Sequence, residues 1–364
     1  MRGIAPSGGS HGNAASGRAV VAAMSTLRLP KLSVLDLVTV SEGSTSADAI
    51  ASSKRLVDAA DRLGYHRYWV AEHHNTSSVA STSPAVLLAH LGQGTSQIRL
   101  GSGGVMLPNH APLIVAEQFA LLEAMFPGRI DLGLGRAPGT DPITAAALRR
   151  VPGNEAVERF PEDVFELLGL LGEVRPEHSS EWLRRLRATP VAGNDVPEVW
   201  ILGSSLYGAG LAAKLGLPYS FANHFGMGSN PVSPVDHYRR HYTPSERWPK
   251  PHVLMSASVI VADSFEEAKR LAMPSRIAGW QLRMGKLGPV QSPEQAAETA
   301  SRIVDQELFA RVRGTQHLGT AEQVARQLAE LAEQTGADEL LLAATTYDVE
   351  DRIRTLEALA PYLP

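Results

Sequence analysis

The chain has 364 residues, of which 44% are hydrophobic and 20% charged, and its formal net charge is −4. No run of lysine and arginine is long enough to neutralise a phosphate backbone, which argues against nucleic acid as a partner. The sequence contains no cysteine, which excludes disulfides, a thiolate nucleophile and cysteine-ligated zinc or iron–sulfur sites.

Residues 1–25 are dominated by glycine, serine and alanine, and they lack the continuous apolar core of a secretory signal. We expect a disordered extension there, followed by one domain over residues 26–364. A transit peptide is the alternative, because Arg2 and Arg18 lie among small residues without acids, although no amphipathic stripe supports it. No apolar stretch approaches the ~20 residues that a membrane span requires. We therefore expect a soluble, cytoplasmic protein with no membrane partner.

The first elements alternate between strand and helix. Residues 32–40 form a β-branched apolar run that predicts a strand, and residues 48–63 carry apolar side chains at helical spacing. Gly64 follows, where helices commonly end on a glycine. Residues 68–71 predict a second strand, which completes a β-α-β unit. The alternation continues with a helix at 84–91, a strand at 98–106, a helix at 111–125 and a strand at 130–134.

The second half repeats this pattern after a polar helix at 156–171. Roughly eight strands, each followed by a helical pattern, favour an α/β fold, a (β/α)8 TIM barrel, over an open sheet. A long insertion at residues 273–316 interrupts the pattern before the last strand, and it is either a lid over the site or a structural excursion. The remaining elements are strands at 199–202, 219–223, 253–261 and 339–345, with helices at 206–215 and 235–242.

Reactive side chains, and on one strand a pair of glycines, gather where the predicted strands end, which is where the active sites of (β/α)8 barrels lie. They come from five strands, and this convergence predicts a functional site. The residues are Glu72, His73 and His74 after the second strand, Gly103 and Gly104 on the third, Arg136 after the fourth, Ser204 and Ser205 after the fifth, and Asn223 and His224 after the sixth.

The Glu72-His73-His74 cluster has several interpretations. Neighbours on a strand point to opposite faces, so only Glu72 and His74 could share a metal ion, and a further ligand would have to come from elsewhere. One histidine could instead hydrogen-bond within the barrel wall while the others are solvated. Because a histidine titrates near neutral pH, His73 could also exchange a proton with a reacting oxygen.

Gly203, Ser204 and Ser205 follow a strand and open a helix. They offer backbone N–H groups, two hydroxyls and the positive end of a helix to an anion such as phosphate. An ordinary serine N-cap is the alternative. Arg136 at a neighbouring strand end favours the anion site, since a guanidinium can hold phosphate or stabilise an anionic ring. Separately, the glycines at 101–104 predict either a close approach to a large flat group or a strained bulge.

Taken together, several motifs resemble the bacterial luciferase-like flavin-dependent monooxygenase family, and in particular its single-subunit, FMN-type members. The resemblance covers about residues 32–363. It rests on the order and spacing of WVAEHH at 69–74, LGSGGVMLP at 100–108, GRIDLGLGRAPG at 128–139, VWILGSS at 199–205 and the late Leu318-Gly319-Thr320.

The resemblance implies a barrel that binds reduced FMN with its phosphate at Gly203, Ser204 and Ser205. Arg136 falls on a flavin-contacting arginine of the family. His73 falls on the histidine that acts as catalytic acid or base in luciferase, and Glu72 beside it is taken as a second catalytic residue.

Other parts of the site also follow from the resemblance. Gly103-Gly104 falls on a cis peptide beneath the flavin ring, and the insertion at 273–316 falls on a mobile lid. Two departures stand out, because Gly135 replaces the reactive cysteine of luciferase and the phosphate loop carries Ser204-Ser205 in place of Glu-Ser. Light emission is therefore not implied.

The expected function is an FMN-dependent monooxygenase that uses O2 and reduced FMN, supplied by a separate flavin reductase, to oxygenate a small organic substrate. We expect His74, Met106 and Phe225 in the substrate pocket, no bound metal, and a homodimer packed through helices near the second and third strands. One alternative is a deazaflavin (F420) enzyme that transfers hydride on the same barrel. Others are a metal-dependent hydrolase using Glu72, His73 or His74, and a non-catalytic flavin carrier.

Overall fold

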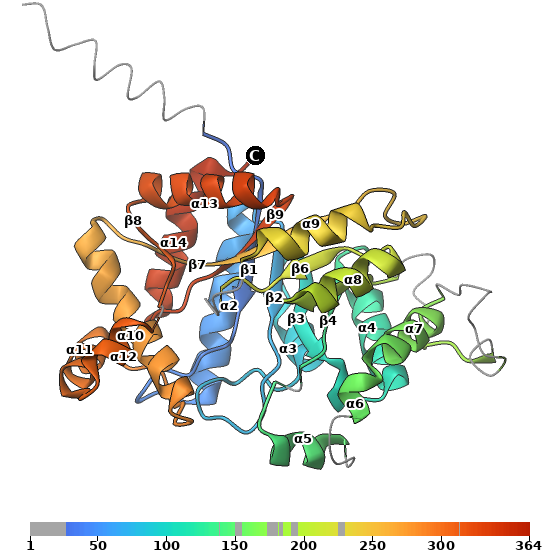
Figure 1. Ribbon diagram of the computed structural model, residues 1–364, viewed down its shortest axis with the longest axis horizontal. Helices are drawn as coiled ribbons and strands as arrows, with labels where there is room; N and C mark the ends of the chain where they lie inside the picture. Colours follow the sequence, from blue (N-terminus) through green and yellow to red (C-terminus); the bar gives the residue numbers. More distant parts are fainter. Residues whose placement is uncertain are drawn as a thin grey trace, which may run out of the picture.

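The structure is a computed structural model in which parallel strands close into a barrel surrounded by helices (Figure 1). It describes residues 27–137, 139–149, 155–172, 181, 185–190, 196–224, 230–312 and 314–364. The strands are β1 (Lys31–Asp36), β2 (Arg67–Val70), β3 (Arg99–Met106), β4 (Ile130–Gly135), β5 (Glu198–Gly203), β6 (Tyr219–Phe221), β7 (Val253–Val261), β8 (His317–Gly319) and β9 (Glu339–Ala343).

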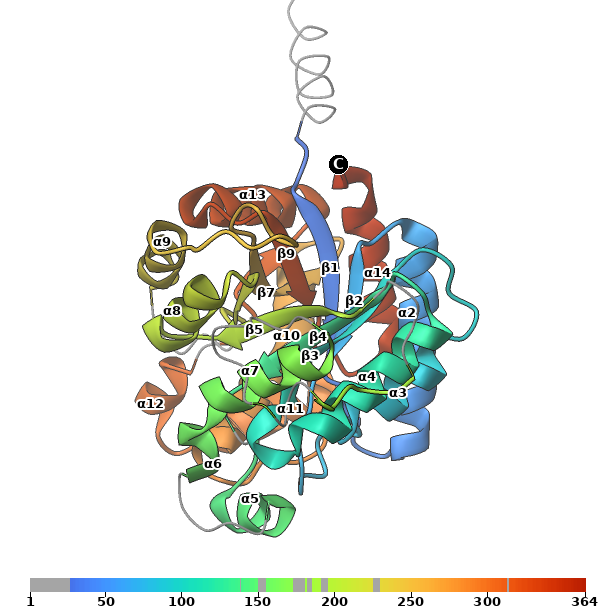
Figure 2. The same ribbon diagram turned by 90° about the vertical axis from the view of Figure 1, so that its right-hand side faces the viewer.

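The helices surround the barrel, and α2, α3, α4 and α14 lie along one side of it (Figure 2). The α-helices are α2 (Ser46–Leu63), α3 (Pro84–Leu91), α4 (Pro112–Met125), α5 (Pro142–Arg149), α6 (Glu155–Glu158), α7 (Phe160–Leu170), α8 (Leu206–Leu215), α9 (Val232–Arg240), α10 (Phe265–Arg283), α11 (Pro293–Arg302), α12 (Gln306–Ala310), α13 (Ala321–Thr335) and α14 (Val349–Leu359). Short 3-10 turns are η1 (Leu107–Asn109) and η3 (Ala360–Tyr362).

The barrel closes through parallel pairing of β1 to β6 in order, then β6 with β7, β7 with β9, and β9 with β1. This confirms the predicted (β/α)8 fold, and all eight predicted strands are present. The strand β8 was not expected. It pairs only with the far end of β7, at Val259–Val261, outside the closed barrel.

One predicted helix is divided in two. The polar helix expected at 156–171 is observed as α6 and α7, separated at Arg159. Pro161 lies in the first turn of α7, where a missing backbone N–H costs nothing. Within a continuous helix the same proline would remove a hydrogen bond and clash with the preceding turn, so α7 starts as a new helix.

The barrel interior is filled in layers, because alternate residues of each strand point inward. At the N-terminal ends of the strands, Arg67 pairs with Asp131 (Nη1–Oδ2 2.8 Å) and Glu339 (Nε–Oε1 3.1 Å). Above them, Trp69 and Trp200 pack edge to face, with ring centroids 5.4 Å apart. This filling closes the lower barrel, and the pocket described below lies at the C-terminal ends of the strands.

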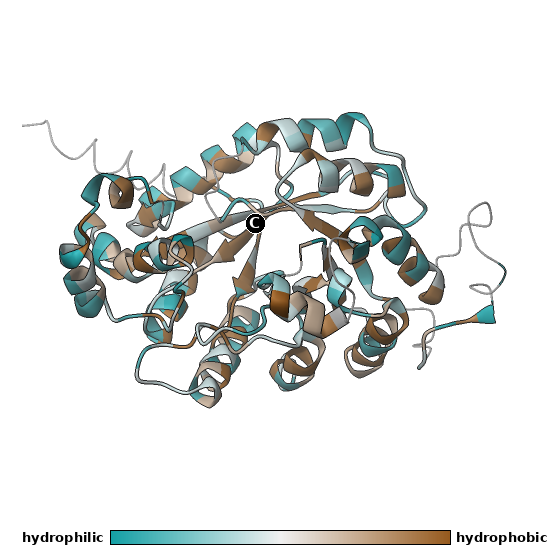
Figure 3. Ribbon diagram, turned by 60° about the horizontal axis from the view of Figure 1, so that its bottom comes forward, coloured by the Kyte–Doolittle hydropathy of each residue, from teal (hydrophilic) through white to brown (hydrophobic). Residues whose placement is uncertain are grey.

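A larger apolar core lies between the outer strand faces and the surrounding helices. Figure 3 shows the hydrophobic colour on both the central strands and the surrounding helices, with polar residues on the outer turns of the helices. The helix α2 illustrates how local sequence places these helices: Thr45 and Asp48 form a capping box at its start, and Gly64 ends it with a φ of 86°. The predicted glycine terminus is thus confirmed. No described helix has both the length and the apolarity needed to cross a bilayer.

The insertion at residues 273–316 contains the second half of α10 together with α11 and α12 (orange in Figure 1). It has a small core of its own, formed by Ile277, Ala296, Phe309 and Val312. Val290 joins it to the loop after β1, because its N–H donates to the Val40 carbonyl at 2.8 Å and its carbonyl accepts from the Glu42 N–H at 2.8 Å. A mobile lid at this position stays a prediction.

Candidate active site

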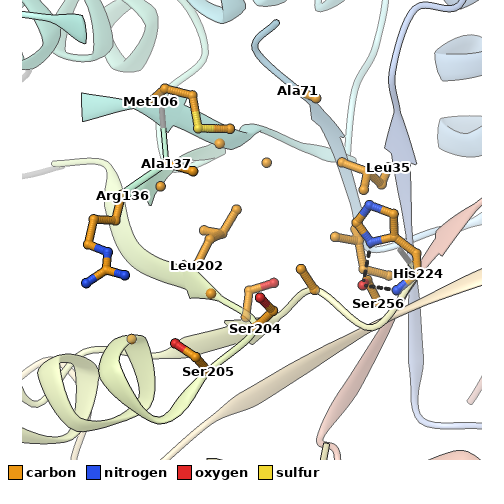
Figure 4. A pocket seen from close by; sticks show the side chains of 18 of the residues that line it. Leu35, Ala71, Met106, Arg136, Ala137, Leu202, Ser204, Ser205, His224 and Ser256 are labelled. Carbon is orange, nitrogen blue, oxygen red and sulfur yellow. Dashed lines mark hydrogen bonds between the residues drawn. The ribbon is translucent and has the colours of Figure 1, made fainter. Parts of the chain in front are cut away.

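A pocket of about 1010 Å³, including its open mouth, lies at the C-terminal ends of the barrel strands. Two groups of polar residues stand apart in it, with Leu202 between them (Figure 4). Arg136, Ser204 and Ser205 form what we call the anion end. His224 and Ser256, which are bonded to each other, form with Ser220 and the nearby His73 what we call the histidine end. The remaining walls are mainly apolar, with Leu35, Leu37, Ala71, Met106, Phe160, Ala222 and Leu341.

His73 lies in the loop after β2 and lines the pocket. Its backbone N–H donates to the Ser81 carbonyl at 2.9 Å, and its ring Nδ1 is 3.2 Å from the Gly139 carbonyl. A carbonyl can only accept, so Nδ1 carries the proton and Nε2 of the neutral ring carries a lone pair. Burial lowers the pKa of His73, although the Gly139 carbonyl and Glu72 act in the opposite direction. The ring is therefore neutral at pH 7 and can accept a proton.

Glu72 and His74 lie outside the pocket lining and turn toward the end of β3. Glu72 is fully buried, and its Oε1 is 2.8 Å from Nε2 of both His74 and His110. Its Oε2 accepts the Met106 N–H at 2.9 Å. Burial favours a higher pKa for Glu72, but the bonds and charge from these partners outweigh burial and lower it. Glu72 is thus a charged, hydrogen-bonded group beside the pocket, and the structure places His74 with it.

His110 is the third group that a metal ion on Glu72 and His74 would need. The three potential ligand atoms lie within 4.8 Å of one another. However, a tetrahedral zinc ion with bonds of ~2.0–2.1 Å separates its ligand atoms by about 3.3 Å. The observed 2.8 Å from Glu72 Oε1 to each imidazole is instead the length of a charge-assisted N–H···O bond. The geometry of this cluster favours hydrogen bonding over metal coordination.

The anion end is built at the start of α8. Ser205 is its N-cap residue, with extended backbone, and its hydroxyl makes no capping hydrogen bond. Ser204 and Ser205 are exposed to the pocket. The first backbone N–H groups of a helix lack intrahelical partners, and the helix dipole is positive there. The predicted serine N-cap position is therefore present, and its hydroxyl remains available to an anion.

Arg136 follows β4 and reaches the same end of the pocket (Figure 4). Its guanidinium lies 3.9 Å from the centroid of the Tyr207 ring, on the first turn of α8. Across the described residues, no carboxylate forms an ion pair with Arg136. A cation held by an aromatic face and not neutralised by a carboxylate can bind an anionic ligand.

The glycines of β3 shape the floor of the pocket. The Gly103-Gly104 peptide bond is cis, and both residues line the pocket. The pairing of β3 with β4 shifts register between Gly103 and Val105, so a strand irregularity is present as predicted. A Cβ atom at Gly101 would lie 2.5 Å from the Trp69 indole nitrogen. The large flat group that Gly101 accommodates is thus the Trp69 side chain.

The amino-acid sequence from residue 31 to residue 339 matches the luciferase-like monooxygenase family. The chain belongs to this family. The predicted family and the predicted class of enzyme, a luciferase-like monooxygenase, are confirmed.

Relatives within the family align over nearly the whole chain. The luciferase-like monooxygenase of Escherichia coli K12 is 39% identical, over 89% of this chain and 94% of that protein. The uncharacterized protein YvbT of Bacillus subtilis is 41% identical, over 90% and 95%. The N-acetyl-S-alkylcysteine monooxygenase of Bacillus subtilis is 35% identical, over 83% and 89%.

Solved structures of similar fold include both FMN-type and F420-type proteins. Apo-MsnO8 has a TM-score of 0.81 and 33% identity, covering 92% of this chain and 98% of its own. The oxygenating constituent of 3,6-diketocamphane monooxygenase from Pseudomonas putida, in complex with FMN, has a TM-score of 0.67 at 19% identity, covering 92% and 99%. An F420-dependent secondary alcohol dehydrogenase has a TM-score of 0.62 at 15% identity, covering 92% and 100%. At these low identities the last two show a shared fold alone.

The structure places His224, which the sequence analysis named at the end of the sixth strand, in the pocket, and it adds Ser256 as its partner. His224 lies across the pocket from Arg136, and its Nδ1 is 2.7 Å from the Ser256 hydroxyl (Figure 4). Burial, together with the nearby His73, lowers the pKa of His224 to about 4. Met106 lines the pocket as expected, and Phe225 lies outside the described residues. The strand-end position of His224 was the available sequence signal, whereas Ser256 lies within a strand and gave none.

Proposed function

We propose that the protein is an FMN-dependent monooxygenase that oxygenates a small, largely apolar organic substrate. The observation that supports this is the two-ended pocket. Donors for an anion lie at Arg136, Ser204 and Ser205, a neutral base lies at His73, and most of the remaining lining is apolar. A long planar molecule with one anionic group matches this distribution.

The donor set at the anion end fits the phosphate of FMN. Ser204 and Ser205 supply hydroxyls, the start of α8 supplies backbone N–H groups, and Arg136 supplies a positive charge. The main-chain surface at Gly103-Gly104 and the side chain of Leu202 suit the face of an aromatic ring system. Reduced FMN would supply the chemistry that activates O2, and the protein would supply orientation, charge and exclusion of water.

The residues of the histidine end have a definite role in this proposal. His73, with Nδ1–H bonded to the Gly139 carbonyl, accepts a proton at Nε2 from a reacting group and later returns it. Its lowered pKa keeps it unprotonated at neutral pH, as a general base requires. The apolar residues of the lining, among them Leu35, Met106 and Phe160, exclude water from the pocket.

FMN is proposed over F420 because two relatives described as monooxygenases are 39% and 35% identical to this chain. Apo-MsnO8, whose fold is similar, is 33% identical. The F420-dependent alcohol dehydrogenase is 15% identical. We propose that O2 is the second substrate and that a separate reductase supplies the reduced flavin. We also propose a cytoplasmic enzyme.

A homodimer is proposed through the outward faces of α3 and α4. These helices carry large apolar side chains that are strongly exposed: Val86 is 68% exposed, Ile114 50%, Leu121 46% and Met125 46%. The two helices contact each other, so these side chains belong to one region of the surface. Extended apolar surface of this kind commonly forms contacts between subunits, and a symmetric copy of the chain would cover it.

Ligand titration tests the cofactor assignment. We expect FMN to bind more tightly than riboflavin, which has the same ring and no phosphate, and we expect no comparable binding of F420. The Ser204→Ala/Ser205→Ala double variant should bring the affinity for FMN close to that for riboflavin, while riboflavin binding stays the same. Lys214→Ala on the same helix is the matched control, because Lys214 lies in the last turn of α8. Equal binding of FMN by wild type and the double variant would contradict the phosphate assignment.

A further inference from the structure

The loop that carries His73 is fixed by contacts on both sides of that residue. Glu72 precedes His73 and points away from the pocket into the cluster with His74 and His110. The Thr140 hydroxyl donates to the His74 carbonyl at 3.1 Å. The loop after β2 is therefore held by the segment after β3 and by the loop after β4.

The buried Glu72 carboxylate is the centre of these contacts. It receives four hydrogen-bond donors: the imidazoles of His74 and His110, the Asn109 side-chain amide at 3.3 Å, and the Met106 N–H. Three of the four come from the end of β3 and from the segment that follows it. A fully buried carboxylate with these partners holds its geometry tightly, because any shift leaves a charge or several donors unsatisfied.

We propose that Glu72, together with His74 and His110, is a positioning cluster that fixes His73 for proton transfer, and that Glu72 itself does not transfer protons in the reaction. This inference rests on the proposed function of His73. It changes the sequence-based expectation for Glu72, which was taken as catalytic, and for His74, which was taken as a pocket residue. It also assigns a role to His110, which no sequence motif indicated.

The two substitutions Glu72→Gln and Glu72→Ala separate positioning from proton transfer. In Glu72→Gln the amide oxygen can keep the Met106 N–H, while the NH2 group donates to His74 and His110 after each imidazole moves its proton to Nδ1. Three of the four contacts are then preserved with no carboxylate, and only the long one from the Asn109 amide, at 3.3 Å, is lost. In Glu72→Ala, the four donors lose their acceptor.

We expect Glu72→Gln to keep kcat within about threefold of wild type, and Glu72→Ala to lower kcat by about 10- to 100-fold, as displacement of a catalytic group does. KM and the affinity for FMN should stay close to wild type in both variants, because the anion end is untouched. His110→Ala, whose side chain is partly exposed, should lower kcat in the same way if Glu72→Ala fails to fold. Adding His110→Ala to Glu72→Ala should cause little further loss, since both act through one cluster.

His252→Ala is the matched control. His252 also lies beside a buried carboxylate, with its Nε2 3.5 Å from Glu339 Oε2, but at the N-terminal end of the barrel. We expect its kcat to match wild type. Equal losses in Glu72→Gln and Glu72→Ala would overturn the proposal and make Glu72 a proton-transferring group. Unchanged kcat in Glu72→Ala and His110→Ala would overturn it as well.

A second readout does not depend on the cofactor. The Nδ1 proton of His73, bonded to the Gly139 carbonyl, should give a slowly exchanging signal in nitrogen-15 NMR spectra of wild type and Glu72→Gln. It should exchange fast in Glu72→Ala and His110→Ala. If wild type shows no turnover with FMN, the proposed function fails, and this signal still decides the positioning role. An unchanged signal in every variant would contradict that role independently.

Discussion

Gly139→Ala should displace the carbonyl that holds the His73 ring, and the structure allows the size of the effect to be calculated. Gly139 has a φ of 64°, and a Cβ atom there would lie 3.0 Å from both the Glu72 carbonyl and Met106 Cγ. The left-handed backbone costs about 1–2 kcal/mol for a residue with a side chain. Relief of the two contacts also requires the loop to move by a few tenths of an ångström, which displaces the carbonyl that holds His73 Nδ1 at 3.2 Å.

A neutral hydrogen bond of this kind contributes about 0.5–1.5 kcal/mol. Its loss from the transition state would lower kcat by about 2- to 12-fold, at about 1.4 kcal/mol for each factor of ten. We therefore expect Gly139→Ala to lose about 1–2 kcal/mol in urea unfolding, and to lose kcat in a reductase-coupled assay of product formation. KM should change little.

Gly128→Ala is the control for the stability lost through the left-handed backbone alone. Gly128 has a φ of 74°, nothing lies within 4 Å of the position of its Cβ, and it precedes β4 at the opposite end of the barrel. We expect the same loss of stability and an unchanged kcat. If the two variants show the same kcat, the bond from His73 to Gly139 does not orient the base, and the assignment of His73 loses its main geometric support.

Burial favours a raised pKa for Glu339, but Arg67 and the neighbouring hydrogen bonds outweigh burial and lower the pKa to about 2. The stability that this carboxylate contributes is therefore complete above about pH 4.5 and is lost as the pH falls toward 2. Acid unfolding of Arg67→Met should begin at a higher pH than that of wild type. Leu121→Glu should convert a dimer into a monomer in analytical ultracentrifugation, and an unchanged mass would exclude the α4 face. Ser256→Ala should remove the partner of His224 Nδ1 and lower kcat while FMN binding stays constant, and a fall in FMN affinity instead would place this group at the flavin.

The fold was predictable because its signals are local. The β-branched run that becomes β7 and the helix that becomes α8 were predicted with the same bounds that the structure shows. Gly64 ends α2 as expected, since the left-handed backbone there favours glycine. The strands alternate with helices at short spacing, and this pattern alone favours a parallel barrel.

The candidate site was predictable only where strand ends carry reactive side chains. His73, Arg136 and the serines after β5 occupy such ends, and the pocket brings them to one cavity. No sequence pattern indicated His110 or Tyr207, because their partners lie far away in the sequence. Glu72 is 38 residues from His110, and the elements α5 to β5 lie between Arg136 and Tyr207. Contacts of this kind depend on how the barrel closes, and no local spacing encodes them.

The fate of isotopically labelled O2 tests most directly whether the protein is an FMN-dependent monooxygenase that relies on His73. The wild-type protein would be incubated with FMN, a separate flavin reductase and a panel of thioethers, aldehydes and ketones, and the products analysed by mass spectrometry, with His73→Ala in parallel. We expect one labelled oxygen atom in the product of wild type, and a large loss of labelled product in His73→Ala although that variant still binds FMN. Unlabelled product, labelled product without FMN, or equal yields from both proteins would contradict an FMN-dependent monooxygenase that relies on His73.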